Sequence, residues 1–450
     1  MERTLVKDTP SKIGQAITLK GWVNTKRDHS KVVFIDLRDR SGLIQVVFWG
    51  DISSAAKTLS SEDAIQVEGL VKERSSQNIN PDLDTGTVEI EATSLTVLAT
   101  SAELPFDMGK ENLDLDISTL LDNRSLSFRH PKTQAIFKVQ AVIIDSFRKA
   151  LIAKDFLEFQ APSIINAIPE GGAEVFKLKY FDSEAYLSQS PQLYKSLLTT
   201  AFERVFSVNQ IFRAEPSSTT RHLTEATSLD VEFNFIDSWT EVQEMEEYVV
   251  RSIFKEVEER CQKELALFGA TIPTMSDKFP ILKLREAQEI IFERTGRDCR
   301  NEKDFSPEDE REICAWAKEE KGSDLIFVSH FPTNKKPFYV YPDPVEPEYA
   351  FSVDLLCRGV EWSSGGQRLN DYDNILKNIK EWGLKEKDVA LYLQAFKYGS
   401  PQLGGFALGA ERITMFILGL KNIREASMFP RDMERIDTKL SSDETITLNT

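Results

Sequence analysis

The residues best suited to grip a polyphosphate lie in the stretch 211–236. Arg213 and Glu215 stand two positions apart near the end of a predicted strand, which puts their side chains on one face. Arg221 and His222 follow in a polar loop before a second predicted strand. One arginine side chain can donate hydrogen bonds to two phosphate oxygens at once and can stack on planar rings. Two arginines with a glutamate between them therefore suit a nucleotide. The alternative is a solvated hairpin whose charges form surface ion pairs.

The second strand of this stretch alternates between apolar and polar residues. Such alternation predicts one face packed on a core and an opposite face crowded with polar groups. The predicted apolar face consists of Leu229, Val231, Phe233 and Phe235, and the polar face of Ser228, Asp230, Glu232 and Asn234.

A second group of residues with chemical potential occupies positions 351–368. Asp354 and Glu361 are an odd number of residues apart, so on one continuous strand they would point in opposite directions. A tight turn at Arg358-Gly359 is predicted to bring both carboxylates to one face. The predicted cross-strand pairs are Asp354 with Ser363 and Leu356 with Glu361. Two carboxylates with a nearby hydroxyl suit a Mg²⁺ ion that carries phosphates, whereas the alternative is a charged hairpin face.

Composition limits what kind of protein can position these residues. The chain has 450 residues, of which 41% are hydrophobic and 10% aromatic, enough for two or three folded domains. The net charge of −17 argues against a protein that coats nucleic acid nonspecifically. No apolar run approaches a membrane span, and the first residues lack the apolar core of a signal peptide. We therefore expect a cytoplasmic protein with no membrane contact.

The four cysteines and four histidines are scattered along the chain. No two cysteines are near in sequence, so neither a zinc ribbon nor a redox pair is indicated. We expect reduced, structural thiols. The cysteines are Cys261, Cys299, Cys314 and Cys357.

The N-terminal part of the chain reads as a small barrel of short strands separated by turns. The predicted strands are residues 16–23, 31–38, 43–49, 64–71 and 86–98. Beyond it, helical spacing predicts a long amphipathic helix over 131–154, and a short strand over 156–160. A helix capped by Ser190 would place Lys195 one turn from its start. The charged stretch 238–268 is predicted to be a helix with a solvated face.

Several of these segments resemble the motifs of class II aminoacyl-tRNA synthetases, in a form close to archaeal-type aspartyl-tRNA synthetases. Phe212-Arg213-x-Glu215, followed by Arg221-His222-Leu223-x-Glu225 and Asp230, is similar to motif 2. The helix over 131–154 with Pro162 resembles motif 1, and Gly404 to Arg412 resembles motif 3. The phrase Gly21-Trp22-Val23 and the stretch 36–42 resemble the family's OB-fold anticodon-binding domain.

The resemblance implies a role for individual residues. It implies catalysis by Arg213 and Arg412, and ATP binding by Arg213, Glu215, Arg221, His222, Leu223, Glu361 and Arg412. It implies aspartate binding by Glu170, Gln192, Lys195, Asp230, Ser364 and Arg368. It implies that Asp354, Glu361 and Ser364 hold Mg²⁺, and that Asn24, Arg27, Phe34 and Gln45 contact the tRNA anticodon.

The resemblance also implies an α+β fold with an OB-fold barrel and a catalytic domain whose antiparallel sheet is flanked by helices. The expected parts are a barrel domain (1–103), a linker (104–130), a catalytic domain (131–438) and a polar tail (439–450). The implied reaction attaches L-aspartate to tRNA(Asp) through aspartyl-adenylate, in a homodimer formed through motif 1. Asparaginyl-tRNA synthetase, an amide ligase and a regulatory binding protein are the alternatives.

The residue at position 24 leaves open whether the enzyme charges tRNA(Asp) alone or tRNA(Asn) as well. Asn24 stands where the archaeal family tends to carry Trp or His, a position linked to whether the enzyme tells two tRNAs apart. Because Asn24 matches neither residue, an enzyme restricted to tRNA(Asp) and one that also charges tRNA(Asn) with aspartate both remain compatible with the sequence.

Overall fold

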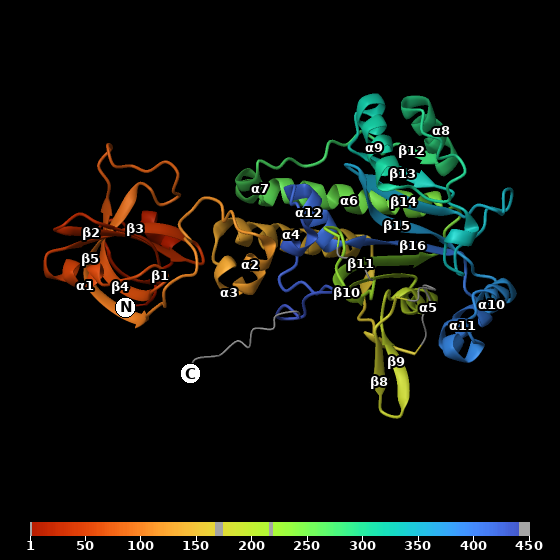
Figure 1. The fold of residues 1–450 in the computed structure, drawn as a ribbon, viewed down its shortest axis with the longest axis horizontal. Coiled ribbons are helices and arrows are strands. Elements are labelled where there is room, and N and C mark those ends of the chain that lie inside the picture. The colour runs from red at the N-terminus through yellow and green to blue at the C-terminus, as the bar shows by residue number, and fades with distance from the viewer. Residues whose placement is uncertain (1, 167–173, 216–218, 441–450) are drawn as a thin grey trace. The chain divides into compact units, whose positions relative to one another are not determined.

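The computed structural model describes residues 2–166, 174–215 and 219–440. The chain divides into two compact units, Met1–Leu115 and Asp116–Thr450. Figure 1 shows the barrel of the first unit and the large sheet of the second. Within the described residues, no helix is long and apolar enough to cross a membrane.

The first unit is a closed five-strand barrel, as predicted, and its strand order is β1-β2-β3-β5-β4. Its strands are β1 (Ala16–Asp28), β2 (Val32–Asp39), β3 (Gly42–Trp49), β4 (Ala64–Glu73) and β5 (Val88–Ala99), and helix α1 is Asp51–Lys57. Alternation sorts the side chains of β2: Val33, Ile35 and Leu37 are fully buried in the barrel. Phe34 and Asp36 between them therefore face outward.

The second unit is built on an eight-stranded sheet with order β12-β13-β14-β15-β16-β11-β10-β6. These strands are β6 (Leu157–Glu158), β10 (Arg204–Phe212), β11 (Glu225–Asn234), β12 (Ile281–Lys283), β13 (Leu325–Ser329), β14 (Ser352–Cys357), β15 (Val360–Arg368) and β16 (Leu403–Gly409). The centre is antiparallel, as predicted, but β12–β13 and β6–β10 pair in parallel at the two edges. A small second sheet contains β7 (Ile164–Ile165), β8 (Lys177–Tyr180) and β9 (Ser183–Leu187).

Helices flank the large sheet (Figure 1). The helices of the second unit are α2 (Ile117–Asp122), α3 (Arg124–Ser127), α4 (Pro131–Ile152), α5 (Gln192–Phe202), α6 (Thr240–Arg260), α7 (Gln262–Phe268), α8 (Leu284–Thr295), α9 (Pro307–Lys321), α10 (Tyr372–Glu381), α11 (Ala390–Lys397) and α12 (Ala410–Leu418). Apolar residues of α4, α6 and α12 join those of β11, β15 and β16 in one core. Residues 116–130, counted with the linker in the sequence prediction, contain α2 and α3 and belong to the second unit.

Two local predictions are wrong. The stretch 238–268 is more than a solvated helix, because α6 buries Val249, Ile253 and Phe254 against the sheet and a separate α7 follows. Phe235 does not share the apolar face of β11: the strand ends at Asn234, and Phe235 has a φ of 60° and is 66% exposed. Leaving the strand conformation frees its side chain from the alternation that buries Phe233.

The predicted reduced state of the thiols is confirmed. All four cysteines are free and buried. Burial raises the pKa of Cys314 to about 12, so this thiol stays protonated and unreactive at neutral pH.

Candidate active site

Strands β10 and β11 form the floor of the candidate site. They pair antiparallel along their length, with Ser207 opposite Asp230. The predicted strand included Arg213, but β10 ends at Phe212; the Arg213 N–H still donates to the Thr224 carbonyl oxygen at 2.9 Å. This extra bond extends the hairpin and holds the base of Arg213, whose side chain is 54% exposed.

One cavity of about 310 Å³ collects every residue predicted to bind ATP. Its walls include Arg213, Glu215, Arg221, His222, Leu223, Glu361 and Arg412. They come from three places in the sequence: the β10–β11 connection, β15 and the start of α12. The cross-strand pairs of β11 and β15 with β16 bring these segments together.

The charged groups in this cavity are loosely held. Glu215 lies 3.6 Å from Arg213 and 3.4 Å from Nε2 of His222. Arg221 lies 3.8 Å from Glu310 of α9. Arg412 donates from Nη1 to the Glu361 carbonyl oxygen at 2.7 Å and keeps 30% of its side chain exposed. Long, exposed ion pairs contribute little stability, so these cations are free to turn toward a polyphosphate.

A second cavity of about 220 Å³ collects the residues predicted to bind aspartate. Gln192, Lys195, Asp230, Ser364 and Arg368 all line it. The remaining predicted residue, Glu170, lies outside the described residues. Arg213 and Ser364 line both cavities, so an amino acid in one would meet a nucleotide in the other at these side chains.

A buried charge network forms the floor of the amino-acid cavity. Lys195 lies 3.0 Å from Asp230 and 3.4 Å from Glu232. Arg368 donates from Nε to Glu232 at 3.1 Å and from Nη2 to the Gly405 carbonyl oxygen at 2.9 Å. Burial alone would raise the pKa of Glu232, but the charges of Arg368 and Lys195 bring that pKa below its usual value. Glu232 is therefore ionised, and its two cations are held in place before a ligand binds.

The first turn of α5 and the close approach of β16 to Glu232 hold this network in place. The Ser190 hydroxyl accepts the N–H of Gln192 at 3.1 Å at the start of α5, which sets the turn that carries Lys195. A Cβ on Gly405 would lie 2.2 Å from Glu232 Oε2 and 2.1 Å from the Val231 carbonyl oxygen. Glycine at 405 is thus required for Glu232 to occupy its place.

A β-bulge sets the geometry of the β14–β15 hairpin. Leu356 pairs with Glu361 as predicted, but Asp354 pairs with Ser364 instead of Ser363, because Trp362 is an extra residue on β15. The correction has a consequence for the site. Three residues apart on a regular strand, Glu361 and Ser364 would point to opposite faces, but the extra residue lets both line the nucleotide cavity.

The two carboxylates predicted to hold a metal, Asp354 and Glu361, repel each other electrostatically. Asp354 is ion-paired with Lys336 at 2.8 Å. The pKa of Glu361 is raised, first by desolvation of its carboxylate in the protein and second by the negative charge of Asp354. Its side chain is nevertheless 41% exposed to the cavity. A cation between them would relieve this repulsion, so the donor set fits Mg²⁺. Within the described residues, no group of three or more His, Cys, Asp and Glu side chains could hold a metal.

Comparison with known proteins identifies the family. The model of "tRNA synthetases class II (D, K and N)" matches residues 116–433, and that of "OB-fold nucleic acid binding domain" matches residues 17–98. This chain belongs to the class II tRNA synthetases.

Relatives of this synthetase match over nearly their whole length. An aspartate–tRNA(Asp/Asn) ligase of Thermus thermophilus is 39% identical over 96% of this chain and 99% of its own. An aspartate–tRNA(Asp) ligase of Pyrococcus horikoshii is 38% identical over 94% and 96%. Among solved structures, asparaginyl-tRNA synthetase of Pyrococcus horikoshii in complex with asparaginyl-adenylate superposes with a TM-score of 0.87, at 32% identity, over 97% of this chain and 99% of that chain.

The predicted anticodon residues of the synthetase lie on the barrel. Arg27 donates to Asp36 at 3.0 Å and to Gln45 at 3.1 Å across the outer surface of β1, β2 and β3. Phe34 lies opposite Arg27 in the β1–β2 ladder, with its ring edge-on to His29. Asn24, at a bulge in β1, accepts from Arg38 at 2.9 Å. The structure thus brings Arg27, Phe34 and Gln45 together on one outer face.

The sequence analysis did not predict three residues in or next to the synthetase site, namely Glu232, Lys336 and Glu246. Glu232 could have been suspected, because it faces the same way as Asp230 two positions earlier. Lys336 comes from a connection with no motif, and Glu246 lies on the charged helix α6. Glu246 is hydrogen-bonded to Ser363 behind the hairpin, and its burial raises its pKa to about 8.

Proposed function

We propose that this chain attaches L-aspartate to tRNA in two steps driven by ATP. The observation that carries the proposal is the junction of two cavities at Arg213, one lined by buried Lys195 and Arg368 and the other by exposed arginines. An anionic amino acid suits the first and a polyphosphate the second. The names of the relatives at 38–39% identity support aspartate as the amino acid.

Aspartate would be selected by its side-chain carboxylate. Arg368 offers a planar fork and Lys195 a second cation, while the ammonium group would be held by Asp230 and Glu170. Lys195 and Arg368 are both almost fully buried, so the charge-assisted hydrogen bonds that they would donate to a carboxylate are strong. An amide offers one oxygen acceptor and turns an NH₂ group toward one of the cations, and this loss is the basis of discrimination against asparagine.

In the first step, an oxygen of the α-carboxylate attacks the α-phosphorus of ATP. The bond to the pyrophosphate oxygen breaks, which leaves aspartyl-adenylate and pyrophosphate. Arg213 and Arg412 would stabilise the charge that develops on the α-phosphate, and Glu215 with His222 would hold the nucleotide. Orientation and electrostatic stabilisation supply the rate, so no covalent enzyme intermediate is needed.

A Mg²⁺ ion carried by the phosphates would be held by Asp354, Glu361 and Ser364. Its chemistry there is neutralisation of phosphate charge. Lys336 beside Asp354 would hold the same carboxylate while no nucleotide is bound.

In the second step, a terminal ribose hydroxyl of the tRNA attacks the aspartyl carbonyl carbon and AMP leaves. The outer face of the barrel, with Arg27, Phe34 and Gln45, would bind the anticodon through phosphate contacts and base stacking. The relatives include ligases named for tRNA(Asp) alone and for tRNA(Asp/Asn), so the scope of this chain is decided by experiment. A cytoplasmic location stays a prediction.

An asparaginyl-tRNA synthetase is the second candidate, because a structure of that enzyme superposes closely. An amide side chain, however, carries no charge to match Lys195 and Arg368. The matched structure is also 32% identical, below the 38–39% of the aspartate ligases. The charge of the cavity and the names of the 38–39% identical relatives favour aspartate.

We also propose a homodimer formed through α4. An apolar cavity of about 420 Å³ lies along this helix, with Phe128, Phe137 and Met428 among its walls. Phe429 beside it is 62% exposed. Exposed apolar area of this kind suits burial against a second copy. Phe429→Asp places a charge in this apolar surface and should shift the sedimentation coefficient toward that of the monomer. A variant that still sediments as a dimer would contradict the proposed interface.

The overall proposal is tested by aminoacylation with labelled aspartate on tRNA(Asp) and tRNA(Asn) transcripts separately. Charging of tRNA(Asp) alone would define a discriminating enzyme, and charging of both would define a nondiscriminating one. Labelled asparagine is the control. Transfer of asparagine, or ATP turnover without any transfer, would contradict the proposal.

A further inference from the structure

The bulge at Trp362 in β15 sorts neighbouring side chains onto the two faces of the sheet. Glu361 and Ser364, on either side of the bulge, line the nucleotide cavity. Between them, Trp362 packs edge-on against an aromatic ring of α6, with 5.8 Å between the ring centroids, and the Ser363 hydroxyl donates to Glu246 of the same helix. Two consecutive residues of a strand ordinarily point in opposite directions, so the bulge is what lets both reach α6. The position of the bulge therefore decides which side chains face the nucleotide.

The Ser363 hydroxyl lies in apolar surroundings. Its neighbours across the sheet are Leu355 of β14 and Leu408 of β16, and both are buried in the core. Ser363 itself is 2% exposed. A buried hydroxyl without a hydrogen-bond partner costs free energy, whereas on the other face of the sheet the same hydroxyl would meet the open nucleotide cavity. Glu246 removes this cost, because its carboxyl group accepts from the hydroxyl on the α6 side.

Glu246 is itself an unfavourable residue for its place in the fold. It is fully buried, and its neighbours on the same face of α6 are Val242, Val249 and Val250. Its second carboxyl oxygen, Oε2, has no hydrogen-bond partner within the described residues. An apolar side chain at this position would avoid the cost of burying a carboxyl group. What the carboxyl gives in return is one defined position for Ser363.

We infer that Glu246 is a positioning residue for the nucleotide site, and that it acts by fixing the place of the bulge in β15. The inference rests on the proposed function, because the site that it positions is the proposed place of ATP and Mg²⁺. If the bulge moves along the strand, Ser363 turns toward the cavity and Ser364 turns toward α6. The hydroxyl opposite Asp354 then leaves the face that carries Glu361, and the hydroxyl that replaces it lies about 3.3 Å away along the strand.

The test removes the carboxyl group and then removes the need for it. Glu246→Leu takes away the partner of the Ser363 hydroxyl, and Glu246→Met is a second variant of the same kind. Glu246→Gln keeps a partner, because an amide both donates and accepts hydrogen bonds. In Glu246→Leu/Ser363→Ala neither side chain is polar, so residue 363 can stay on the α6 side without cost. The Kd of ATP is measured by equilibrium titration with and without Mg²⁺, and thermal midpoints report folding.

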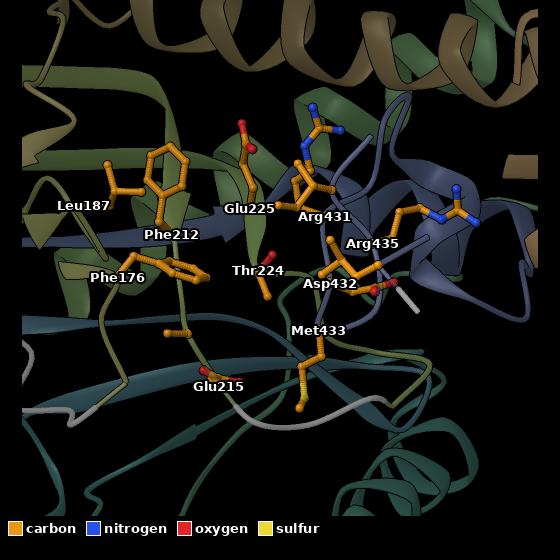
Figure 2. A pocket seen from close by; sticks show the side chains of 13 residues that line it. Phe176, Leu187, Phe212, Glu215, Thr224, Glu225, Arg431, Asp432, Met433 and Arg435 are labelled. Carbon is orange, nitrogen blue, oxygen red and sulfur yellow. The ribbon is translucent and has the colours of Figure 1, made fainter. Parts of the chain in front are cut away.

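Two control variants leave the bulge untouched. Glu244→Leu changes an exposed position of the same helix. Met433→Leu changes the lining of a cavity of about 390 Å³ that shares Glu215 with the nucleotide cavity. Figure 2 shows Met433 and Glu215 among the side chains that line this neighbouring cavity. The second control separates an effect of the bulge from a general disturbance next to the nucleotide site.

For Glu246→Leu and Glu246→Met, we expect the Kd of ATP in the presence of Mg²⁺ to rise about tenfold, the loss of about one hydrogen bond. Without Mg²⁺ it should stay within about twofold of the wild type, because the displaced hydroxyl is one of the groups proposed to hold the ion. Glu246→Gln, the double variant and both controls should bind ATP like the wild type under both conditions.

An unchanged Kd in Glu246→Leu and Glu246→Met would overturn the inference. So would a double variant or a Glu246→Gln that binds as weakly as Glu246→Leu, because the Ser363 hydrogen bond would then not be the cause. Equal weakening with and without Mg²⁺ would also overturn it, since a purely structural role of Glu246 predicts that result. Absence of aspartate-dependent ATP–pyrophosphate exchange in the wild type would instead contradict the proposed function, while the ATP titrations still test Glu246.

Discussion

The two cavities that meet at Arg213 handle charge in opposite ways. In the amino-acid cavity, the side chains of Lys195 and Arg368 are 2% and 6% exposed and are paired with buried carboxylates. In the nucleotide cavity, the side chains of Arg213 and Arg412 are 54% and 30% exposed, with longer ion pairs. The same residue types thus serve one rigid and one adaptable site.

The difference follows from what each ligand demands. A small amino acid is distinguished from its amide by one charge, so its site gains from cations that cannot move or become hydrated. A polyphosphate presents many oxygens and brings its own counterion, so long, exposed arginines can adjust around it. Substitutions in the buried network should therefore alter specificity, and substitutions of the exposed arginines should alter rate.

The largest expected effect is in the buried network. Arg368→Leu removes the fork proposed to bind the substrate carboxylate and also leaves Glu232 with one cation fewer. We expect kcat/KM for aspartate to fall by about 10³-fold, the range for breaking a buried charge pair, while the Kd of ATP stays within about twofold. Steady-state exchange kinetics and ATP titration measure both. Arg300→Leu, at an exposed site, is the control; an equal loss of ATP affinity in Arg368→Leu would contradict the assigned role.

A smaller effect is expected in the exposed site. Arg412→Ala should lower kcat for adenylate formation by about 10²-fold, as for loss of one donor to a developing charge. Because Arg412 does not line the amino-acid cavity, KM for aspartate should change little. Rapid-quench measurement of adenylate formation at several aspartate concentrations separates the two constants. If Arg412→Ala mainly raised KM for aspartate instead of lowering kcat, the two cavities would not have the separate roles proposed for them.

Behind the hairpin, Glu246 gives a pH effect on stability. Its pKa in the folded chain is about 8, against an ordinary value of 4.5, so the folded state binds its proton more tightly. The contribution of Glu246 is therefore present below pH 4.5 and is lost as pH rises to about 8, with a slope of at most about 1.4 kcal/mol per pH unit. Glu246→Gln should flatten this decline in thermal midpoints between pH 5 and pH 8.5.

The matched control for this measurement is Glu244→Gln, at an exposed position of the same helix. It should leave the wild-type slope intact. A decline that is equally steep in Glu246→Gln would mean that another group titrates in this range.

The smallest expected effect lies outside both cavities. Arg27→Ala on the barrel should raise KM for tRNA by about tenfold at most, because its ion pairs are exposed and one stack or phosphate contact is involved. ATP–pyrophosphate exchange without tRNA should be unchanged. Altered exchange in this variant would show that the barrel influences the chemical site.

The sequence was informative where function depends on short segments. The residues that the family resemblance predicts to bind ATP lie in short segments of recognisable sequence, and all of them line one cavity. Alternation along β11 correctly placed Leu229 and Asp230 on opposite faces. The barrel strands were recognisable because turns separate short alternating runs.

The missed features depend on contacts between distant segments. Glu232 acquires its role from Lys195 and Arg368, which the fold brings from other elements. The bulge at Trp362 changes the partner of Asp354, and no residue at this position signals an extra residue in a strand. The buried face of α6 was obscured by its many charges, since the hydrophobic stripe is narrow.

The most direct test of the central claim is ATP–pyrophosphate exchange by the wild-type chain with aspartate and with asparagine as alternative substrates. If the buried cations select a carboxylate, aspartate supports exchange with a kcat/KM at least about 10²-fold above that of asparagine. Equal exchange with both amino acids, or a preference for asparagine, would contradict the account of the amino-acid cavity.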